Sequence, residues 1–304
     1  MGERAVMQRP PAADLVWLCI ALVFISASGP MIVACTAPAL AIAFWRCFLG
    51  SGATSIVVLA KARHEFSRLT RREWLLIVAA GLLLGGHFAT WIPSLRFTTV
   101  AASTAMVATQ PVFAALIARA RGRRIPVQAW LGIALAGVGV LVITGVDSSI
   151  DMRHLIGDLL ALVGAFLAAA YVSVGEYARK SVSTSTMTMI LYASSAVLLL
   201  VTCLAGRQAL WGWSWRDWLL IIALTVGAQL LGHTIMNKVL VSTSATVVST
   251  AILFEAPGAT IIAAIALGQI PPLGLIPALA LMLVGVVMVI RSGSRADVSE
   301  TSPI

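Results

Sequence analysis

The sequence predicts an all-α integral membrane protein of ten transmembrane helices, arranged as two inverted five-helix repeats around a central cavity. The first reason is composition: 60% of the residues are hydrophobic and 11% are charged, whereas a soluble domain has about 25% charged residues. The second reason is a series of membrane-length apolar runs, and the third is an internal duplication. A chain this apolar cannot cover its surface with polar groups, so most of that surface must face lipid.

Ten apolar runs are long enough to cross a bilayer, and the loops between them are short. A hydrocarbon core needs about 20 residues of helix, and no strand alternation competes with the helical prediction. Backbone groups within lipid must be satisfied inside the segment, which a helix achieves. The expected spans are residues 15–35, 39–60, 74–93, 99–119, 127–145, 155–175, 185–205, 217–237, 245–267 and 272–291.

Basic residues gather on one side of the predicted membrane. If the N-terminus is placed in the cytoplasm, sixteen Lys and Arg lie on that side, four lie outside, and Arg46 lies within a span. Basic loops stay on the cytoplasmic side of membrane proteins. We therefore expect a multi-pass protein of the cytoplasmic (inner) membrane with both termini in the cytoplasm. The basic excess is an orientation signal, and no nucleic-acid partner is expected.

The chain repeats itself at an offset of 146 residues. The duplication predicts a first repeat at residues 15–146 and a second at 147–291, with short tails at 1–14 and 292–304. Because each repeat has an odd number of spans, the two repeats are inverted in the membrane, as in many transporters. The matching features are "GGH" with "LGH", "VAAST" with "TVVST", "VGV" with "VGV", Gly122 with Gly268, Pro111 with Pro257, and Pro126 with Pro272.

The duplicated unit resembles the EamA-type domain of the drug/metabolite transporter superfamily. The residues that carry the resemblance are "APALAIAFWRCFLG", "LRFTTVAASTAMVATQPVFAALIARARGRRIP" and "ATVVSTAILFEAPGATIIAAIALGQIPP". This resemblance implies ten helices in two inverted bundles around a cavity. It also implies transport of small molecules, often the export of amino acids or other metabolites.

Glu255 is the first candidate for a functional side chain. It lies near the middle of the predicted span 245–267, where an acidic residue costs about 2.5–3.5 kcal/mol on insertion scales. We therefore expect its carboxyl to face the bundle interior, either paired or protonated. It can serve as a ligand for a substrate amine or as a proton-coupling site. The alternative is a structural partner of Arg46 or of a backbone group.

Three ring-bearing residues and one cation are further candidates. His87 and Trp91 stand four residues apart in a predicted helix, so they share a face that suits an aromatic or cationic ligand. His233 is the repeat mate of His87. Arg46 always carries its charge and needs a partner in the membrane, so it either holds a substrate carboxylate or reaches outward to the interface. For the two histidines, the alternative is a satisfied core position.

Two prolines interrupt corresponding spans. Pro111 and Pro257 each remove one helix hydrogen bond, which either shapes the cavity by exposing carbonyls or simply kinks a packed helix. Gln110 precedes the first proline and offers two donors and an acceptor. Tyr171, in the predicted span 155–175, is a weaker candidate for substrate contact.

The sequence favours transport over catalysis. It contains no P-loop, so uphill movement must draw on a gradient rather than on ATP. The four cysteines are scattered singly, and neither a metal, a cofactor nor a catalytic residue is expected. We predict a secondary active transporter that moves a small organic metabolite by alternating access, with an amino acid and export as the first expectation. The alternative is an intramembrane enzyme that acts on a lipid or isoprenoid. The oligomeric state is left open.

Overall fold

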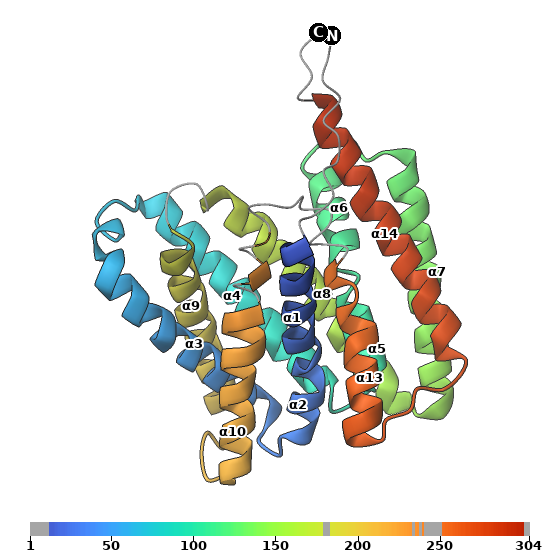
Figure 1. Ribbon diagram of the computed structural model, residues 1–304, viewed down its shortest axis with the longest axis horizontal. Coiled ribbons are helices and arrows are strands. Elements are labelled where there is room, and N and C mark those ends of the chain that lie inside the picture. Colours follow the sequence, from blue (N-terminus) through green and yellow to red (C-terminus); the bar gives the residue numbers. More distant parts are fainter. Residues whose placement is uncertain (1–11, 179–182, 233–234, 237–238, 240–250, 301–304) are drawn as a thin grey trace.

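The computed structural model describes residues 12–178, 183–232, 235–236, 239 and 251–300, and their regular structure is entirely helical (Figure 1). The elements are α1 (Ala12–Ser26), α2 (Ser28–Ala34), α3 (Ala39–Lys61), the 3₁₀ turn η1 (Arg63–Glu65), α4 (Arg71–Ser94), α5 (Val100–Val107), α6 (Gln110–Ala120), α7 (Val127–Ile150), α8 (Met152–Ala178), α9 (Thr184–Ala205), α10 (Trp215–Ala223), the π-helix η2 (Leu224–Gly232), α13 (Glu255–Leu267) and α14 (Leu275–Glu300).

Within the described residues, eight helical segments are long and apolar enough to cross a membrane, which confirms eight of the ten expected spans. The other two expected spans differ in kind. The span expected at 217–237 begins as α10 and continues as the π-helix η2. The span expected at 245–267 lies partly outside the described residues, and its described part contains the shorter helix α13. The count of ten therefore stays a prediction.

The contacts between helices follow a two-fold pattern. The second spans of the two repeats pack together as α3 and α9, the fourth as α5 and α13, and the fifth as α7 and α14. The contact of α4 with α8 is matched by that of η2 with α1, because both pair the third span of one repeat with the first span of the other. Helices α7 and α14 run side by side in opposite directions (Figure 1).

The fourth span of each repeat has a break next to its proline. Helix α5 ends at Val107, and α6 begins at Gln110 with Pro111 in its first turn. In the second repeat, residues 253–254 form a turn and α13 begins at Glu255, two residues before the proline. Proline tolerates the first turn of a helix but not its interior, so each break lies where the sequence permits a restart.

Glycines of the duplicated motifs have matching structural roles. Gly122 and Gly268 follow the C-terminal ends of α6 and α13 with φ angles of 89° and 67°, in the left-handed region that favours glycine. Gly139 and Gly285 lie where α7 crosses α14. A Cβ on Gly139 would lie 2.6 Å from the Cβ of Met282, and one on Gly285 would lie 2.6 Å from the Gly132 carbonyl oxygen. Small residues at such crossings let the helix backbones approach closely.

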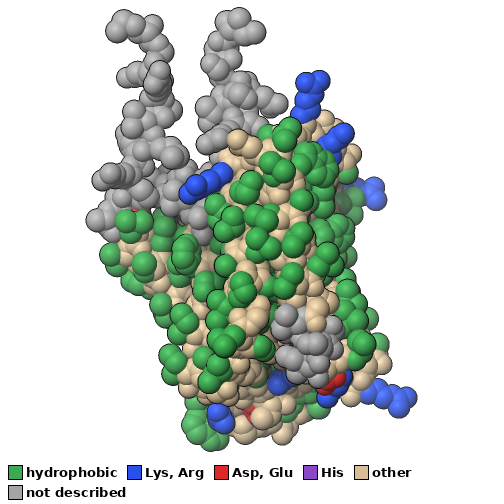
Figure 2. Space-filling model, turned by 90° about the vertical axis from the view of Figure 1, so that its right-hand side faces the viewer, with side chains coloured by type: hydrophobic (Ala, Val, Ile, Leu, Met, Phe, Trp, Pro, Cys, Tyr) green, Lys and Arg blue, Asp and Glu red, His purple; other side chains and the backbone are tan. Residues whose placement is uncertain are grey.

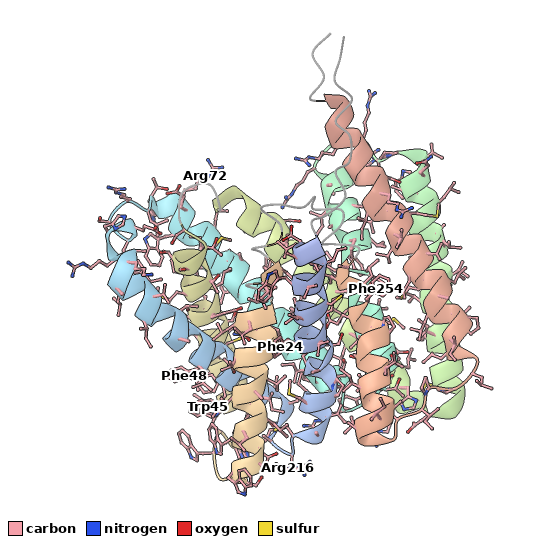
Figure 3. All side chains as sticks on the ribbon, in the orientation of Figure 1. Phe24, Trp45, Phe48, Arg72, Arg216 and Phe254 are labelled. Atoms are coloured by element: carbon pink, nitrogen blue, oxygen red, sulfur yellow. The ribbon has the colours of Figure 1, made fainter. Side chains whose placement is uncertain are left out.

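The outer faces and the two ends of the bundle differ in chemistry. Figure 2 shows hydrophobic side chains over the lateral face that it presents, with Lys and Arg near the ends. Helix α1 begins and α14 ends at the end where Figure 3 labels Arg72, whereas Arg216 lies at the opposite end. An apolar belt between charged ends is the surface of a multi-pass membrane protein.

A carboxylate ties a loop at each end of the bundle. At the end near Arg216, Asp217 is 2% exposed and accepts hydrogen bonds from the Thr36 backbone N–H and hydroxyl, at 2.6 and 2.8 Å. At the other end, Glu65 accepts hydrogen bonds from the Ser183 backbone N–H and hydroxyl, at 3.0 and 2.9 Å. Thr36 precedes α3 and Ser183 precedes α9, the second spans of the two repeats. In both repeats, the residues before the second span are thus held by a carboxylate near the start of the third span, although the two carboxylates do not occupy matching positions of the duplication.

Candidate functional site

The candidate site is centred on Arg46, which α3 places inside the bundle with 3% of its surface exposed. Its Nε donates a hydrogen bond to Oε1 of Gln229 on η2, at 2.8 Å. The same amide donates through Nε2 to the backbone oxygen of Arg46, at 3.1 Å. Gln229 is itself 2% exposed. These two bonds fix the arginine against the π-helical segment.

The rest of the guanidinium faces aromatic and acidic groups. Its central carbon lies 4.5 Å from the ring centroid of Phe88 on α4, a cation–π distance. Nη1 is buried and has no hydrogen-bond partner within the described residues. Glu255 and Arg46 are close enough for their charges to attract each other. The structure thus brings together the two charged residues that the sequence singles out.

His87 and Trp91 lie on one face of α4, as their spacing predicts, and their rings stack with centroids 5.6 Å apart and planes 13° apart. The Nδ1 atom of His87 lies 2.9 Å from the carbonyl oxygen of Gly164 on α8. A carbonyl can only accept, so Nδ1 carries a proton and donates it. This bond holds α4 to α8. Trp91 is 5% exposed, and its Nε1 has no hydrogen-bond partner in the described part of the chain.

The remaining predicted residues lie at the helix breaks and on α8. The residues at the starts of α6 and α13 are all partly buried: Gln110, Pro111, Glu255 and Pro257. The fourth spans of the two repeats meet where α13 contacts α5. Figure 3 labels Phe254, the residue before Glu255, at the upper end of α13. Tyr171 is partly buried against the larger apolar core. His233 lies outside the described residues.

Two further residues complete the surroundings of Arg46, and the sequence interpretation missed both. Gln229 is the amide of the otherwise mostly apolar run "LTVGAQLLG", and an amide in such a run is the signal that could have identified it. Tyr192 on α9 is 8% exposed and lies near Arg46 and Tyr171. Gly50 allows this approach, since a Cβ there would collide with the Gln229 amide and lie 3.1 Å from the Tyr192 ring.

A two-fold bundle of apolar helices, with both fourth spans broken and with a buried arginine and a carboxyl inside it, has the architecture of a membrane transport protein. The chain belongs to the EamA-like transporter family, whose model matches residues 13–145 and 155–291. This family is part of the drug/metabolite transporter superfamily. The two matched segments correspond to the two halves of the duplication.

A solved structure titled "Crystal structure of protein" is similar to this chain in fold. The two share 18% sequence identity over 91% of this chain and 97% of that one, with a TM-score of 0.61. No match is found among the curated proteins. The likeness to the solved structure concerns the fold, and the family match supports a transporter rather than an intramembrane enzyme.

Proposed function

We propose that this protein is a secondary active transporter that moves a small organic metabolite across the cytoplasmic membrane by alternating access. An amino acid or a related compound is the proposed substrate, and export is the proposed direction, on the basis of the family resemblance. Both termini lie in the cytoplasm in this proposal, since the end where α1 begins and α14 ends carries most of the Lys and Arg.

One observation carries the proposal: both repeats break their fourth span, and the second break carries Glu255, whose charge acts on the buried Arg46 of the first repeat. Broken helices in paired repeats provide a binding site at mid-membrane, and rocking of the repeats exposes that site alternately to the two sides. Charged side chains in such a position are costly unless they serve a substrate or ion pathway. Arg46 belongs to the first repeat and Glu255 to the second, which supports a site between the repeats.

The predicted residues have distinct proposed roles. Glu255 binds a substrate amine or carries the coupling proton, while Arg46 binds an acidic group. Pro111 and Pro257 keep the breaks open. Contacts with the rest of the substrate are assigned to His87, Trp91, Gln110, Tyr171 and His233.

Flux in proteoliposomes tests this proposal. Purified protein is reconstituted and challenged with labelled amino acids and related metabolites, with and without a pH gradient. We expect at least one compound to accumulate when a gradient is imposed. Glu255→Gln removes the titratable group, so flux in this variant should no longer respond to the gradient. Glu73→Gln is the control, because Glu73 caps the exposed start of α4 and should leave flux unchanged.

The outcomes separate the parts of the proposal. A broad metabolite panel with no substrate-dependent flux would overturn transport itself. Flux that stays equally sensitive to the gradient in Glu255→Gln would remove this carboxyl from proton coupling while leaving transport in place.

A further inference from the structure

The Arg46 side chain is a buried cation with N–H donors that have no acceptor in the described part of the chain. A guanidinium has five N–H donors and no acceptor. In the described part of the chain its one hydrogen bond is the contact of Nε with Gln229, and the buried Nη1 has no partner. A buried charged donor without an acceptor is strongly unfavourable. A buried donor of this kind is kept where it has another function, and Nη1 can donate to an acceptor that a ligand supplies.

The partner of Arg46 is an amide rather than a carboxylate, and this choice matters. Gln229 holds the arginine from two directions, through Nε and through the backbone oxygen of the same residue. An amide fixes the orientation of the guanidinium without neutralising its charge. Phe88, at 4.5 Å, packs against one face of the guanidinium and also leaves the charge in place. The surroundings therefore position a full positive charge inside the membrane and leave Nη1 of the fork for a ligand.

The geometry points to an oxyanion subsite at Nη1 of Arg46, with Gln229 as its positioning residue, that takes the carboxylate of a monoanionic or zwitterionic substrate. This inference rests on the proposed transport function. Arginine binds carboxylates and phosphates through its planar fork of donors. The chemistry of the neighbours favours a carboxylate: among the described residues, the acidic side chain that acts on Arg46 is Glu255. A single cation beside an acid favours a monoanion over a dianionic phosphate.

The π-helical winding of Leu224–Gly232 is the structural device behind this subsite. A π-helix bonds each residue to the one five positions away, so it is rare and is found at functional sites. The equivalent third span of the first repeat, α4, is an α-helix through the same region. The irregular winding thus belongs to the repeat that supplies Gln229, and it presents the amide to α3.

Matched ligand sets test the inference. The probes are L-leucine, its decarboxylated analogue 3-methylbutylamine and its deaminated analogue 4-methylpentanoate, together with the corresponding set for L-phenylalanine. Thermal stabilisation of the purified protein and competition with the labelled flux substrate are both measured. We expect the compounds with a carboxylate to stabilise and compete, and the amines to be at least tenfold weaker.

Substitutions at Gln229 separate positioning from folding. Gln229→Glu places a carboxylate on Arg46 and should abolish competition by carboxylate compounds. Gln229→Met keeps the side-chain length without the hydrogen bonds, and should weaken carboxylate binding several-fold while changing the affinity for the amines little. Gln128→Met, on the exposed first turn of α7, is the matched control and should leave every affinity unchanged. The melting temperature of each variant without ligand reports on its folding.

The possible outcomes are distinct. Amines that compete as well as their parent amino acids would overturn the carboxylate subsite and leave transport standing. An unchanged carboxylate preference in folded Gln229→Met would overturn the positioning role of Gln229. If no compound of the broad flux panel is moved, the proposed function fails and this inference fails with it.

Discussion

The two repeats share a backbone plan but differ in the side chains that they place at its centre. The first repeat breaks its fourth span beside Thr109 and Gln110, both neutral, whereas the second breaks beside Glu255. The third span of the first repeat is the α-helix α4, and that of the second passes through the π-helix that carries Gln229. Duplication preserves the scaffold, and the second repeat contributes the acid and the amide that surround Arg46.

The largest expected effect comes from the tie that holds the loop before α3. Asp217 is buried and accepts hydrogen bonds from Thr36 and Ser214. Asp217→Ala leaves the buried backbone donor and the hydroxyls without an acceptor, at a cost of about 3 kcal/mol, so the melting temperature should fall by several degrees. Thermal unfolding in detergent checks this. Asp217→Asn should lose less, because its amide oxygen still accepts. An unaltered melting temperature for Asp217→Ala would contradict the role of this tie.

Replacing a glycine by alanine at the crossing of α7 and α14 should lower stability to a similar extent in either repeat. Gly139→Ala and Gly285→Ala each push a Cβ into the facing backbone, and overpacking costs about 1–3 kcal/mol. Gly137→Ala is the matched control, since no atom lies within 4 Å of its Cβ position. The control should gain up to about 1 kcal/mol of helix propensity. Thermal unfolding of the three variants measures this, and three similar melting temperatures would show that the crossing is not tight.

A third prediction concerns a substitution that makes the break in the fourth span of the second repeat resemble that of the first repeat. Glu255→Thr places in α13 the residue type that the first repeat has at the equivalent position, Thr109. Gradient-driven flux should fall at least tenfold, about 1.4 kcal/mol, because the carboxyl proposed to bind or couple is gone. The melting temperature should stay the same or rise, since a costly buried acid is removed. Full flux in this variant would show that the charge difference between the repeats has no role in transport.

The smallest expected effect lies at the other end of the bundle and depends on pH. Hydrogen bonds from Thr186 and Ser183 hold the pKa of Glu65 below its ordinary value of 4.5. A carboxyl whose pKa is lower in the folded state stabilises the fold at pH values above its unfolded-state pKa. This stabilisation is lost as the pH falls through the folded-state pKa. Glu65→Gln should therefore melt slightly below the wild type at pH 7, and the difference should shrink as the pH is lowered beneath about 4.5. A difference independent of pH would contradict the charged tie.

The features that the sequence predicts well are those that repeat or that follow from hydropathy. Eight spans follow from apolar length, and the offset of 146 residues pairs Gly122 with Gly268, which both have a left-handed backbone just after a helix, a conformation that favours glycine. The influence of the Glu255 charge on Arg46 is consistent with the rule that charged side chains inside a membrane lie near opposite charges.

The rest depends on contacts between residues that are distant in the chain. Gln229 meets Arg46 across 183 positions, and Thr36 meets Asp217 across 181. No local pattern encodes either pair. Mean hydropathy also cannot distinguish α from π winding, because it depends on composition alone. The bond of His87 to the Gly164 carbonyl could not be predicted from the sequence either, because every residue has a backbone acceptor and none is marked by its side chain.

The π-helix at Leu224–Gly232 changes which side chains this span turns inward. A π-helix closes its hydrogen bonds over five residues rather than four, so successive side chains are rotated about the axis differently than in an α-helix. Helix α4, the matching span of the first repeat, has α winding. Two copies of one duplicated unit can therefore share a fold and still present different faces to the bundle interior, through backbone pitch as well as through substitution.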